Sequence, residues 1–275
     1  MRVLHGTRRA RFGLACVAAA LVLNYALLTS AGPLAALPAW PLVRLAQQLE
    51  PADPNLAAIL HYLAATWGRL VWLVVGLGWA VCGLRARDLG LRWSGWKEAL
   101  QATLALWAAS EATLAAASAW QGGLEWNPLF HRLSPAATAA GAVYYVFGVA
   151  LFEETFYRGL LVPQFFHFFR ARFPGRAPAL AVLVSQFFFA LSHLPHYALP
   201  FPVPVGLAVL WFTGVLLALM WLRTGNLLIA VGWHGLMDLP YHLTTAPAGW
   251  PEGVTYLVGL LLLAVWPRAA AWRAR

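Results

Sequence analysis

The chain has 275 residues, of which 61% are hydrophobic and 11% are charged, and its mean hydropathy is +0.66. Soluble domains carry about 25% charged residues, so this composition excludes an ordinary soluble domain and indicates a polytopic membrane protein. The formal net charge of +9 comes from Lys and Arg residues that cluster between hydrophobic runs, which is typical of the cytoplasmic flanks of membrane helices. We therefore expect no nucleic-acid partner.

The first hydrophobic run, residues 12–28, follows a basic N-terminal stretch. This pattern also fits a signal peptide, but the many spans that follow favour an uncleaved first helix. A proline-rich loop comes next, with a short interfacial helix expected at residues 42–49. Cys16 and Cys82 lie in apolar runs and lack the spacing of a metal site, so we expect them to be packing residues.

Further membrane spans are predicted along the chain, for a total of about eight. They cover residues 56–84, 99–120, 136–162, 179–194, 205–222, 226–243 and 254–266. Pro163 is expected to kink the helix that begins at residue 136. Lys and Arg concentrate in alternate loops, which predicts that both termini are cytoplasmic. The fold class expected is an all-α polytopic membrane bundle.

One membrane domain is expected to fill residues 1–275. It would consist of N-terminal helices and loops over residues 1–135 and a core over residues 136–243. The composition is rich in Ala and Arg, and Lys97 is the single lysine. This favours a bacterial source, and hence a bacterial plasma (inner) membrane.

Two adjacent carboxylates, Glu153 and Glu154, lie inside the span that begins at residue 136. A charged residue at the centre of a membrane helix costs about 2.5–3.5 kcal/mol on insertion scales. Glu154 and Arg158 are four residues apart, so they share a helical face and can form an ion pair. Glu153 lies about 100° round the helix, which leaves it for a different partner.

The later spans supply candidate partners. His193 lies near the end of one span, and His234 and Asp238 are four residues apart on another, hence on one helical face. His196 follows a proline that is expected to end its helix, so it is a weaker candidate. Ionisable side chains inside the membrane lower one another's insertion cost if they lie close together. We therefore expect one polar cavity lined by Glu153, His193, His234 and Asp238, with Glu and His side chains within one water of each other.

This residue set supports two routes of hydrolysis. Glu153, His193 and His234 could bind zinc with one position open for water, whose pKa the metal would lower towards 7. Alternatively, Glu153 takes a proton from water as a general base, while His193 orients the water and His234 and Asp238 face the oxyanion. Asp238 must be protonated to donate. Two other interpretations stay open, namely hydrogen-bonded packing residues with a structural brace, and a proton relay in a transporter.

Three motifs occur in order on separate predicted spans. They are Glu153-Glu154-x-x-x-Arg158, Phe189-x-x-x-His193 and His234-x-x-x-Asp238. Together they resemble the CPBP family (CAAX protease and bacteriocin-processing, or Abi) of intramembrane proteases, which includes the type II CAAX prenyl proteases. The motifs cover residues 136–243, and residues 88–92 (Asp-Leu-Gly-Leu-Arg) resemble a segment that often precedes this core.

The resemblance implies that Glu153 is the catalytic glutamate that activates water. It also implies that Glu154 and Arg158 support the site, that His193 is the second-motif histidine, and that His234 and Asp238 form the third-motif pair. The family often has Asn where this chain has Asp238. The resemblance leaves open whether zinc or a metal-free glutamate mechanism is used.

The leading hypothesis is thus an intramembrane endopeptidase that acts on a membrane-embedded or lipidated peptide. One alternative is a non-catalytic membrane protein that binds a peptide, as an immunity factor does. A second is a transporter with a buried proton relay, although such transporters more often contain inverted repeats, of which the sequence has no sign.

Overall fold

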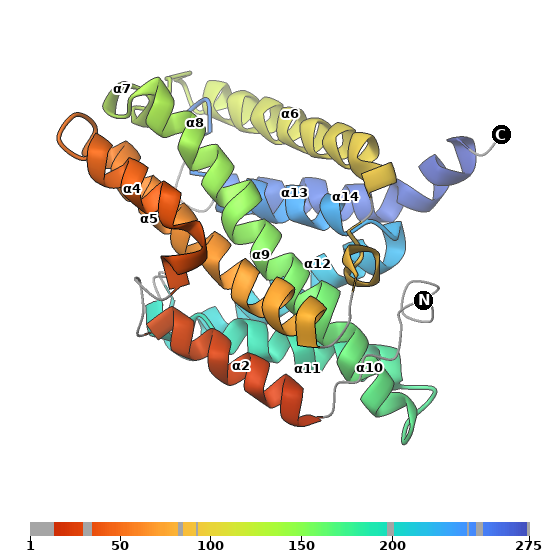
Figure 1. Cartoon of the computed structure of the whole chain (residues 1–275). Coiled ribbons are helices and arrows are strands. Elements are labelled where there is room, and N and C mark those ends of the chain that lie inside the picture. Colours follow the sequence, from red (N-terminus) through yellow and green to blue (C-terminus); the bar gives the residue numbers. More distant parts are fainter. Residues whose placement is uncertain are drawn as a thin grey trace. The chain divides into compact units, whose positions relative to one another are not determined.

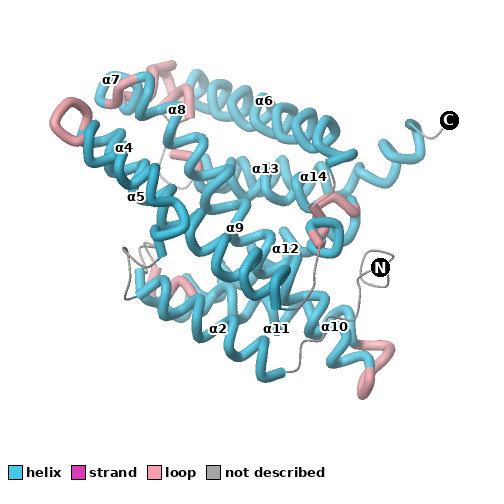
Figure 2. Tube along the Cα trace, in the orientation of Figure 1, coloured by secondary structure: helices cyan, strands magenta, loops and turns pink. Residues whose placement is uncertain are grey.

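A computed structural model describes residues 14–29, 35–81, 85–91, 93–196, 201–240, 242–245 and 250–273. These residues form helices joined by loops (Figures 1 and 2), and they contain no strand beyond an isolated bridge between Trp126 and Thr244. The α-helices are α2 (Leu14–Thr29), α4 (Trp40–Leu49), α5 (Pro54–Arg69), α6 (Trp96–Trp120), α7 (Leu129–Arg132), α8 (Pro135–Val143), α9 (Leu151–Glu153), α10 (Val162–Arg170), α11 (Ala177–Leu191), α12 (Val203–Thr224), α13 (Leu227–Asp238) and α14 (Trp250–Arg273). The all-α prediction is confirmed.

Two other types of helix complete the fold, the wider π-helix and the tighter 3₁₀ helix. The π-helices are η2 (Leu70–Val81), η5 (Tyr144–Ala150) and η6 (Glu154–Leu161), and the short 3₁₀ helices are η1 (Leu37–Ala39), η3 (Ala86–Leu89), η4 (Trp93–Gly95) and η7 (Leu194–His196). The Glu153-Glu154 motif therefore lies where α9 passes into η6. Single π-turns are frequent at functional sites.

Three helices in the described part of the chain are long and apolar enough to cross a membrane, namely Pro54–Gly78, Pro135–Arg170 and Val203–Thr224. Shorter apolar helices cover Val17–Thr29, Ala177–Leu191, Leu227–Asp238 and Gly253–Val265. A helical integral membrane protein is thus confirmed, whereas the total of about eight spans stays a prediction. The expected span at 99–120 is the helix α6, which is more polar because it contains Glu98, Ser110 and Glu111.

Several helix ends differ from the sequence-based expectation. α13 ends at Asp238 rather than near residue 243, because Pro240 cannot continue a helix and disfavours helical backbone at the residue before it. α14 is longer than the expected 254–266. The short helix expected at 42–49 is present as α4. Cys82 and the side chain of Cys16 lie outside what the structure describes.

The helix that contains Pro163 carries π-helical turns immediately before the proline. η6 ends at Leu161, and the backbone N–H of Val162 donates to the carbonyl of Tyr157, five residues back. A proline lacks the N–H of the usual ladder and its ring crowds the carbonyl four residues back, so a wider turn at this point relieves both problems. The kink itself stays a prediction.

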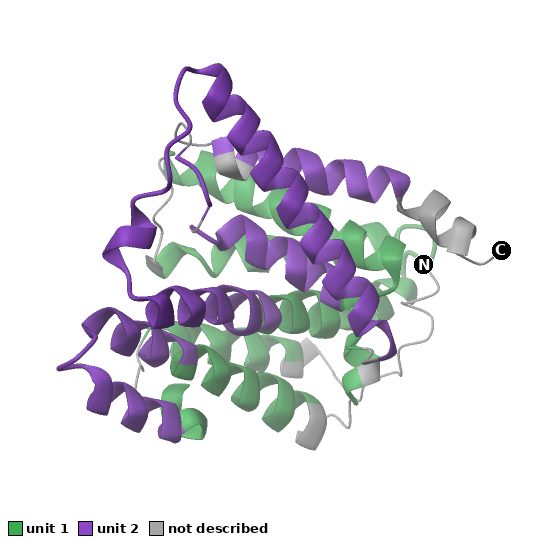
Figure 3. Ribbon diagram, turned by 90° about the horizontal axis from the view of Figure 1, so that it is seen from above, with its two compact units in different colours: residues 1–39, 64–93, 152–227 green, residues 40–63, 94–151, 228–275 purple. Residues whose placement is uncertain are grey.

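The described residues divide into two compact units, each built from three stretches of sequence (Figure 3). The first contains Met1–Ala39, Ala64–Trp93 and Phe152–Leu227, and the second contains Trp40–Leu63, Ser94–Leu151 and Leu228–Arg275. The candidate residues Glu153, Glu154, Arg158 and His193 belong to the first unit, and His234 and Asp238 belong to the second. The single membrane domain and the core at 136–243 stay predictions.

In the first unit, residues 85–91 pack directly on the motif-bearing helix η6. A Cβ added at Gly159 would lie 2.5 Å from the carbonyl oxygen of Leu89, so only glycine allows this approach. Gly90 has φ +81° and packs against the indole of Trp221, a backbone conformation that glycine adopts without steric cost. The segment that resembles the upstream part of the family pattern thus packs against Gly159, the residue directly after the first motif.

In the second unit, small residues let α13 pack closely on three neighbours. A Cβ at Gly232 would overlap Thr103 of α6, and one at Gly235 would lie 2.7 Å from Val146 of η5. On a third side, the Trp233 indole lies against Gly259 of α14 and its Nε1 donates to the Thr255 carbonyl at 3.0 Å. Small residues permit such close helix packing in membranes. His234 therefore sits on a firmly held stretch of helix.

Candidate active site

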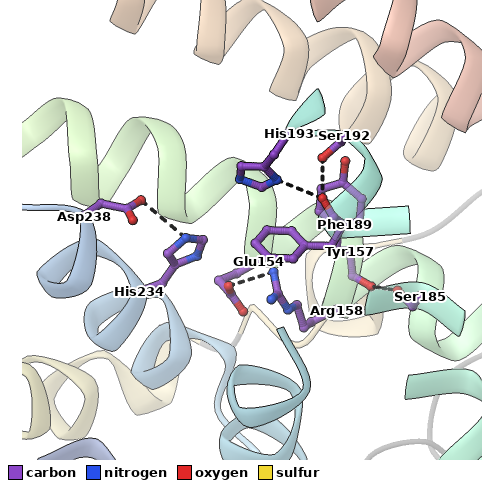
Figure 4. Close-up of polar contacts among 9 residues, drawn as sticks. All are labelled: Glu154, Tyr157, Arg158, Ser185, Phe189, Ser192, His193, His234 and Asp238. Carbon is purple, nitrogen blue, oxygen red and sulfur yellow. Dashed lines mark hydrogen bonds and ion pairs between the residues drawn. The ribbon is translucent and has the colours of Figure 1, made fainter. Parts of the chain in front are cut away.

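The first motif contains a fully buried ion pair. Arg158 Nη1 lies 3.0 Å from Glu154 Oε1, and both side chains are 0% exposed (Figure 4). This confirms the pairing that the four-residue spacing predicts. Glu153, by contrast, is partly exposed and interacts electrostatically with Tyr157. The two adjacent carboxylates therefore have different environments, as expected if they have different roles.

The second motif contacts the first through Phe189. The guanidinium Cζ of Arg158 lies 4.2 Å from the centroid of the Phe189 ring, within the range of a cation–π interaction. The His193 ring meets the same phenyl group edge-on, with centroids 4.8 Å apart. Arg158, Phe189 and His193 thus form one continuous contact between the first two motifs.

The imidazole of His193 is oriented by its own helix end. Its Nδ1 lies 2.9 Å from the Phe189 carbonyl oxygen (Figure 4). A carbonyl can only accept, so Nδ1 carries the proton and the neutral ring presents Nε2 as an acceptor. Zinc-ligating histidines commonly donate their second ring N–H to a backbone carbonyl. His193 Nε2 is therefore suited either to a metal or to a water molecule.

α11 ends earlier than expected. The helix was predicted to end between His193 and His196, but it ends at Leu191. The Ser192 hydroxyl donates to the Phe189 carbonyl at 2.7 Å, and the His193 backbone N–H donates to Ala190 three residues back. Side-chain bonds and a tightened last turn are common ways to satisfy terminal carbonyls. The side chain of His196 lies outside what the structure describes.

Tyr157 is a buried residue of this region that the sequence reasoning missed. Its hydroxyl accepts a hydrogen bond from Asn24 Nδ2 of α2 at 2.9 Å and is also hydrogen-bonded to Ser192. Its carbonyl accepts from Ser185 Oγ at 2.7 Å (Figure 4). Tyr157 therefore joins α2, η6 and α11 beside the first two motifs. The available signal was Asn24, an amide in an otherwise apolar run.

A cation at the end of α5 lies close to Tyr157 and the first motif. Arg69, the last residue of α5, has its guanidinium Cζ 4.8 Å from the centroid of Phe152, and it interacts electrostatically with Tyr157. Phe152 directly precedes Glu153. In the sequence, Arg69 is a single charge inside the predicted span at 56–84. The structure places it in the first unit, next to the first motif.

The third motif forms its own contact in the second unit. His234 Nε2 lies 3.4 Å from Asp238 Oδ2, with the His234 side chain 5% exposed and that of Asp238 34% exposed (Figure 4). The two residues share a helical face, as predicted. If Nε2–H faces the carboxylate, the neutral ring presents Nδ1 on its other side. Asp238 is thus placed to orient the imidazole.

The predicted zinc ligands come from both units. Glu153 and His193 lie in the first, and His234 lies in the second. Within the described residues, no group of three or more His, Cys, Asp or Glu side chains is placed to hold a metal ion. The zinc set and the common cavity of Glu153, His193, His234 and Asp238 therefore stay predictions.

Comparison with curated proteins and with solved structures gave no match. A family comparison did: residues 135–240 match the family described as "Type II CAAX prenyl endopeptidase Rce1-like". This stretch coincides closely with the 136–243 core and contains all six candidate residues, Glu153, Glu154, Arg158, His193, His234 and Asp238. The resemblance to the CPBP and CAAX proteases is thereby confirmed, and the Rce1-like similarity covers residues 135–240.

Proposed function

We propose that the chain is an intramembrane endopeptidase that hydrolyses a peptide bond in a membrane-associated or lipidated peptide. The observation that carries this proposal is the contact series from Glu154 through Arg158 and Phe189 to His193. It joins two of the three motifs in one unit, over residues that match a family of prenyl endopeptidases. Glu153 stands beside this series without being part of its buried ion pair.

In the proposed mechanism, Glu153 accepts a proton from the attacking water as a general base. His193, with Nδ1 held by the Phe189 carbonyl, orients that water through Nε2. His234, doubly protonated with Nε2–H facing Asp238, donates a hydrogen bond from Nδ1–H to the oxyanion that forms on the substrate carbonyl. Asp238 then acts by orienting His234, a role that a carboxylate can fill, whereas direct donation to the oxyanion would require Asp238 to be protonated. Glu154 and Arg158 hold the helix that presents Glu153.

Zinc remains part of the proposal as an alternative way to activate the water. Glu153, His193 and His234 would hold the ion, and it would supply a bound water of lowered pKa. The chemistry of the His193 ring suits this role, because its second nitrogen already donates to a carbonyl. Metal analysis of the purified protein, with Glu153→Ala and His193→Ala as controls, separates the two routes.

The proposed setting is a bacterial plasma membrane, crossed about eight times, with both termini in the cytoplasm. The alternation of basic loops along the chain supports this topology. Reporter fusions at both termini and in the segments predicted to be external, 121–135 and 244–253, would test it. Cytoplasmic signals from the termini and external signals from the loops are expected, and the reverse pattern would contradict the topology.

A cleavage assay tests the activity itself. The probes are a fluorogenic peptide with a farnesylated C-terminal cysteine motif and its unprenylated twin, each mixed with the protein in lipid nanodiscs. Glu153→Gln should lower the cleavage rate by about 10²-fold or more, since a positioned general base contributes 10²–10⁴-fold. Glu125→Gln, an exposed carboxyl in a loop, is the matched control and should cleave normally.

Two results would count against the proposal. Equal cleavage by wild type and Glu153→Gln would remove Glu153 from the chemistry. Binding of either peptide with equal affinity by both proteins, with no cleavage by wild type, would favour a peptide-binding protein instead.

A further inference from the structure

A second buried carboxylate lies outside the Rce1-like residues. Glu111, in the middle of α6, is only 7% exposed. It accepts a hydrogen bond from His242 Nδ1 at 3.1 Å and another from the backbone N–H of Leu243 at 2.9 Å. Both partners follow α13 in the sequence, and the contact spans 131 residues. Because a buried carboxylate is costly at membrane depth, these two bonds indicate a defined role for Glu111.

The segment that Glu111 holds, residues 242–245, is bonded along its length. The Ser118 hydroxyl of α6 donates to the Thr245 carbonyl, and the Thr245 backbone N–H donates to the backbone carbonyl of Glu125 at 2.9 Å. The backbone N–H of Asn127 donates to the Leu243 carbonyl at 3.0 Å. The segment is therefore fixed from two sides, by α6 and by the loop that follows it.

α13 is thus tied to α6 at both ends of the stretch that carries the third motif. At one end, Gly232 lies directly against Thr103. At the other end, the chain leaves α13 at Asp238 and is bound four residues later by Glu111. His234 and Asp238 lie between these two points. Asp238 places a carboxylate at the C-terminus of α13, which the helix dipole disfavours, so a tie directly beyond this turn stabilises it.

We propose that Glu111 is a positioning residue for the His234–Asp238 pair. By binding His242 and the Leu243 N–H, it fixes the end of α13 and so sets the orientation of the His234 imidazole. The role in the reaction rests on the proposed function, whereas the structural coupling from Glu111 to His234 does not. Glu111 acts through the end of α13, so it is a positioning residue and not a catalytic one.

The test is ¹⁵N NMR of histidine-labelled protein in nanodiscs, with the His234 and His242 signals assigned from His234→Gln and His242→Gln spectra. In Glu111→Gln, the charge-assisted bond to His242 is lost while side-chain shape is kept. We expect both the His242 and the His234 ring signals to shift. We also expect backbone hydrogen exchange in the last turn of α13 to become about tenfold faster, the effect of losing one hydrogen bond to a charged group.

Thr113→Val is the matched control, because Thr113 is exposed on the same helix. It should change neither signal. If Glu111→Gln fails to fold, His242→Gln removes the ring contact alone and should shift His234 in the same direction. A shifted His242 signal beside an unchanged His234 signal and unchanged exchange would overturn the proposal. Neither readout needs a substrate, so absence of cleavage would refute the proposed function without touching this result.

Where wild type cleaves the farnesylated peptide, a third readout applies. Glu111→Gln should lower kcat several-fold with KM little changed, because a misoriented His234 weakens an interaction made only in the transition state. A rise in KM alone would contradict positioning of His234 and would assign Glu111 to substrate binding.

Discussion

Substitution of Arg158 by methionine would leave the Glu154 carboxylate buried without its counter-ion. Both side chains are 0% exposed and their nearest charged atoms are 3.0 Å apart. Breaking a buried ion pair by removing one partner costs about 3–5 kcal/mol, and loss of the cation–π contact with Phe189 adds about 0.5–2 kcal/mol. We therefore expect Arg158→Met to lower the free energy of unfolding by about 4–6 kcal/mol.

The double variant Glu154→Gln/Arg158→Met separates the charge effect from packing. It removes both charges, and replacement of a whole buried pair by residues of similar size is often close to neutral. We expect a loss of only about 1–2 kcal/mol, at least about 2 kcal/mol less than the loss expected for Arg158→Met alone. The assay is reversible unfolding in mixed micelles with rising SDS, followed by tryptophan fluorescence.

Arg132→Met is the matched control, because Arg132 is exposed on α7. Its effect should stay within about 0.5 kcal/mol. Equal stability of Arg158→Met and wild type, or single and double variants of equal stability, would refute the reasoning that the pair neutralises a buried charge.

Four further predictions concern individual contacts. Tyr157→Phe removes the hydroxyl that accepts from Asn24 and should lower stability by about 0.6–1.7 kcal/mol, the range for hydrogen bonds in membrane proteins, as measured by the same SDS unfolding. Gly159→Ala places a methyl group 2.5 Å from a backbone carbonyl and should cost about 1–3 kcal/mol, whereas no loss would show that this approach can relax. Ser134 caps α8 through the Ala137 N–H, so Ser134→Ala should cost about 1 kcal/mol. The Ser134 hydroxyl and the Leu56 N–H hold the pKa of Asp53 below its usual value. The stabilisation that ionised Asp53 contributes is therefore fully present above its unfolded-state pKa and is lost as the pH falls through its folded-state pKa. Thermal melts across acidic pH should detect this loss in wild type and a smaller loss in Ser134→Ala.

Local contacts could be predicted from spacing, and long-range contacts could not. The Glu154–Arg158 and His234–Asp238 pairs follow from a separation of four residues on a helix, and both are present. The Asn24–Tyr157 bond spans 133 residues. Helical periodicity says which face a residue occupies but not which distant helix covers it, so such a partner has no local signal.

The contacts of Glu111 are a second example of long-range partners that spacing does not predict. Its presence inside a predicted span was evident in the sequence, but its partners lie beyond the end of α13, in a stretch expected to be helical to residue 243. The early end of α13 at Asp238, imposed by Pro240, is what frees the backbone N–H of Leu243 to donate to Glu111. A single misplaced helix end therefore concealed the contact.

The most direct test of the account asks whether the second and third motifs meet. The experiment uses His193→Cys/His234→Cys in a background with Cys16 and Cys82 replaced by alanine, treated with a short thiol cross-linker in native membranes. A shared active site predicts an efficient intramolecular cross-link, absent from either single-cysteine variant. A folded double variant with two reactive thiols and no cross-link would contradict a shared active site.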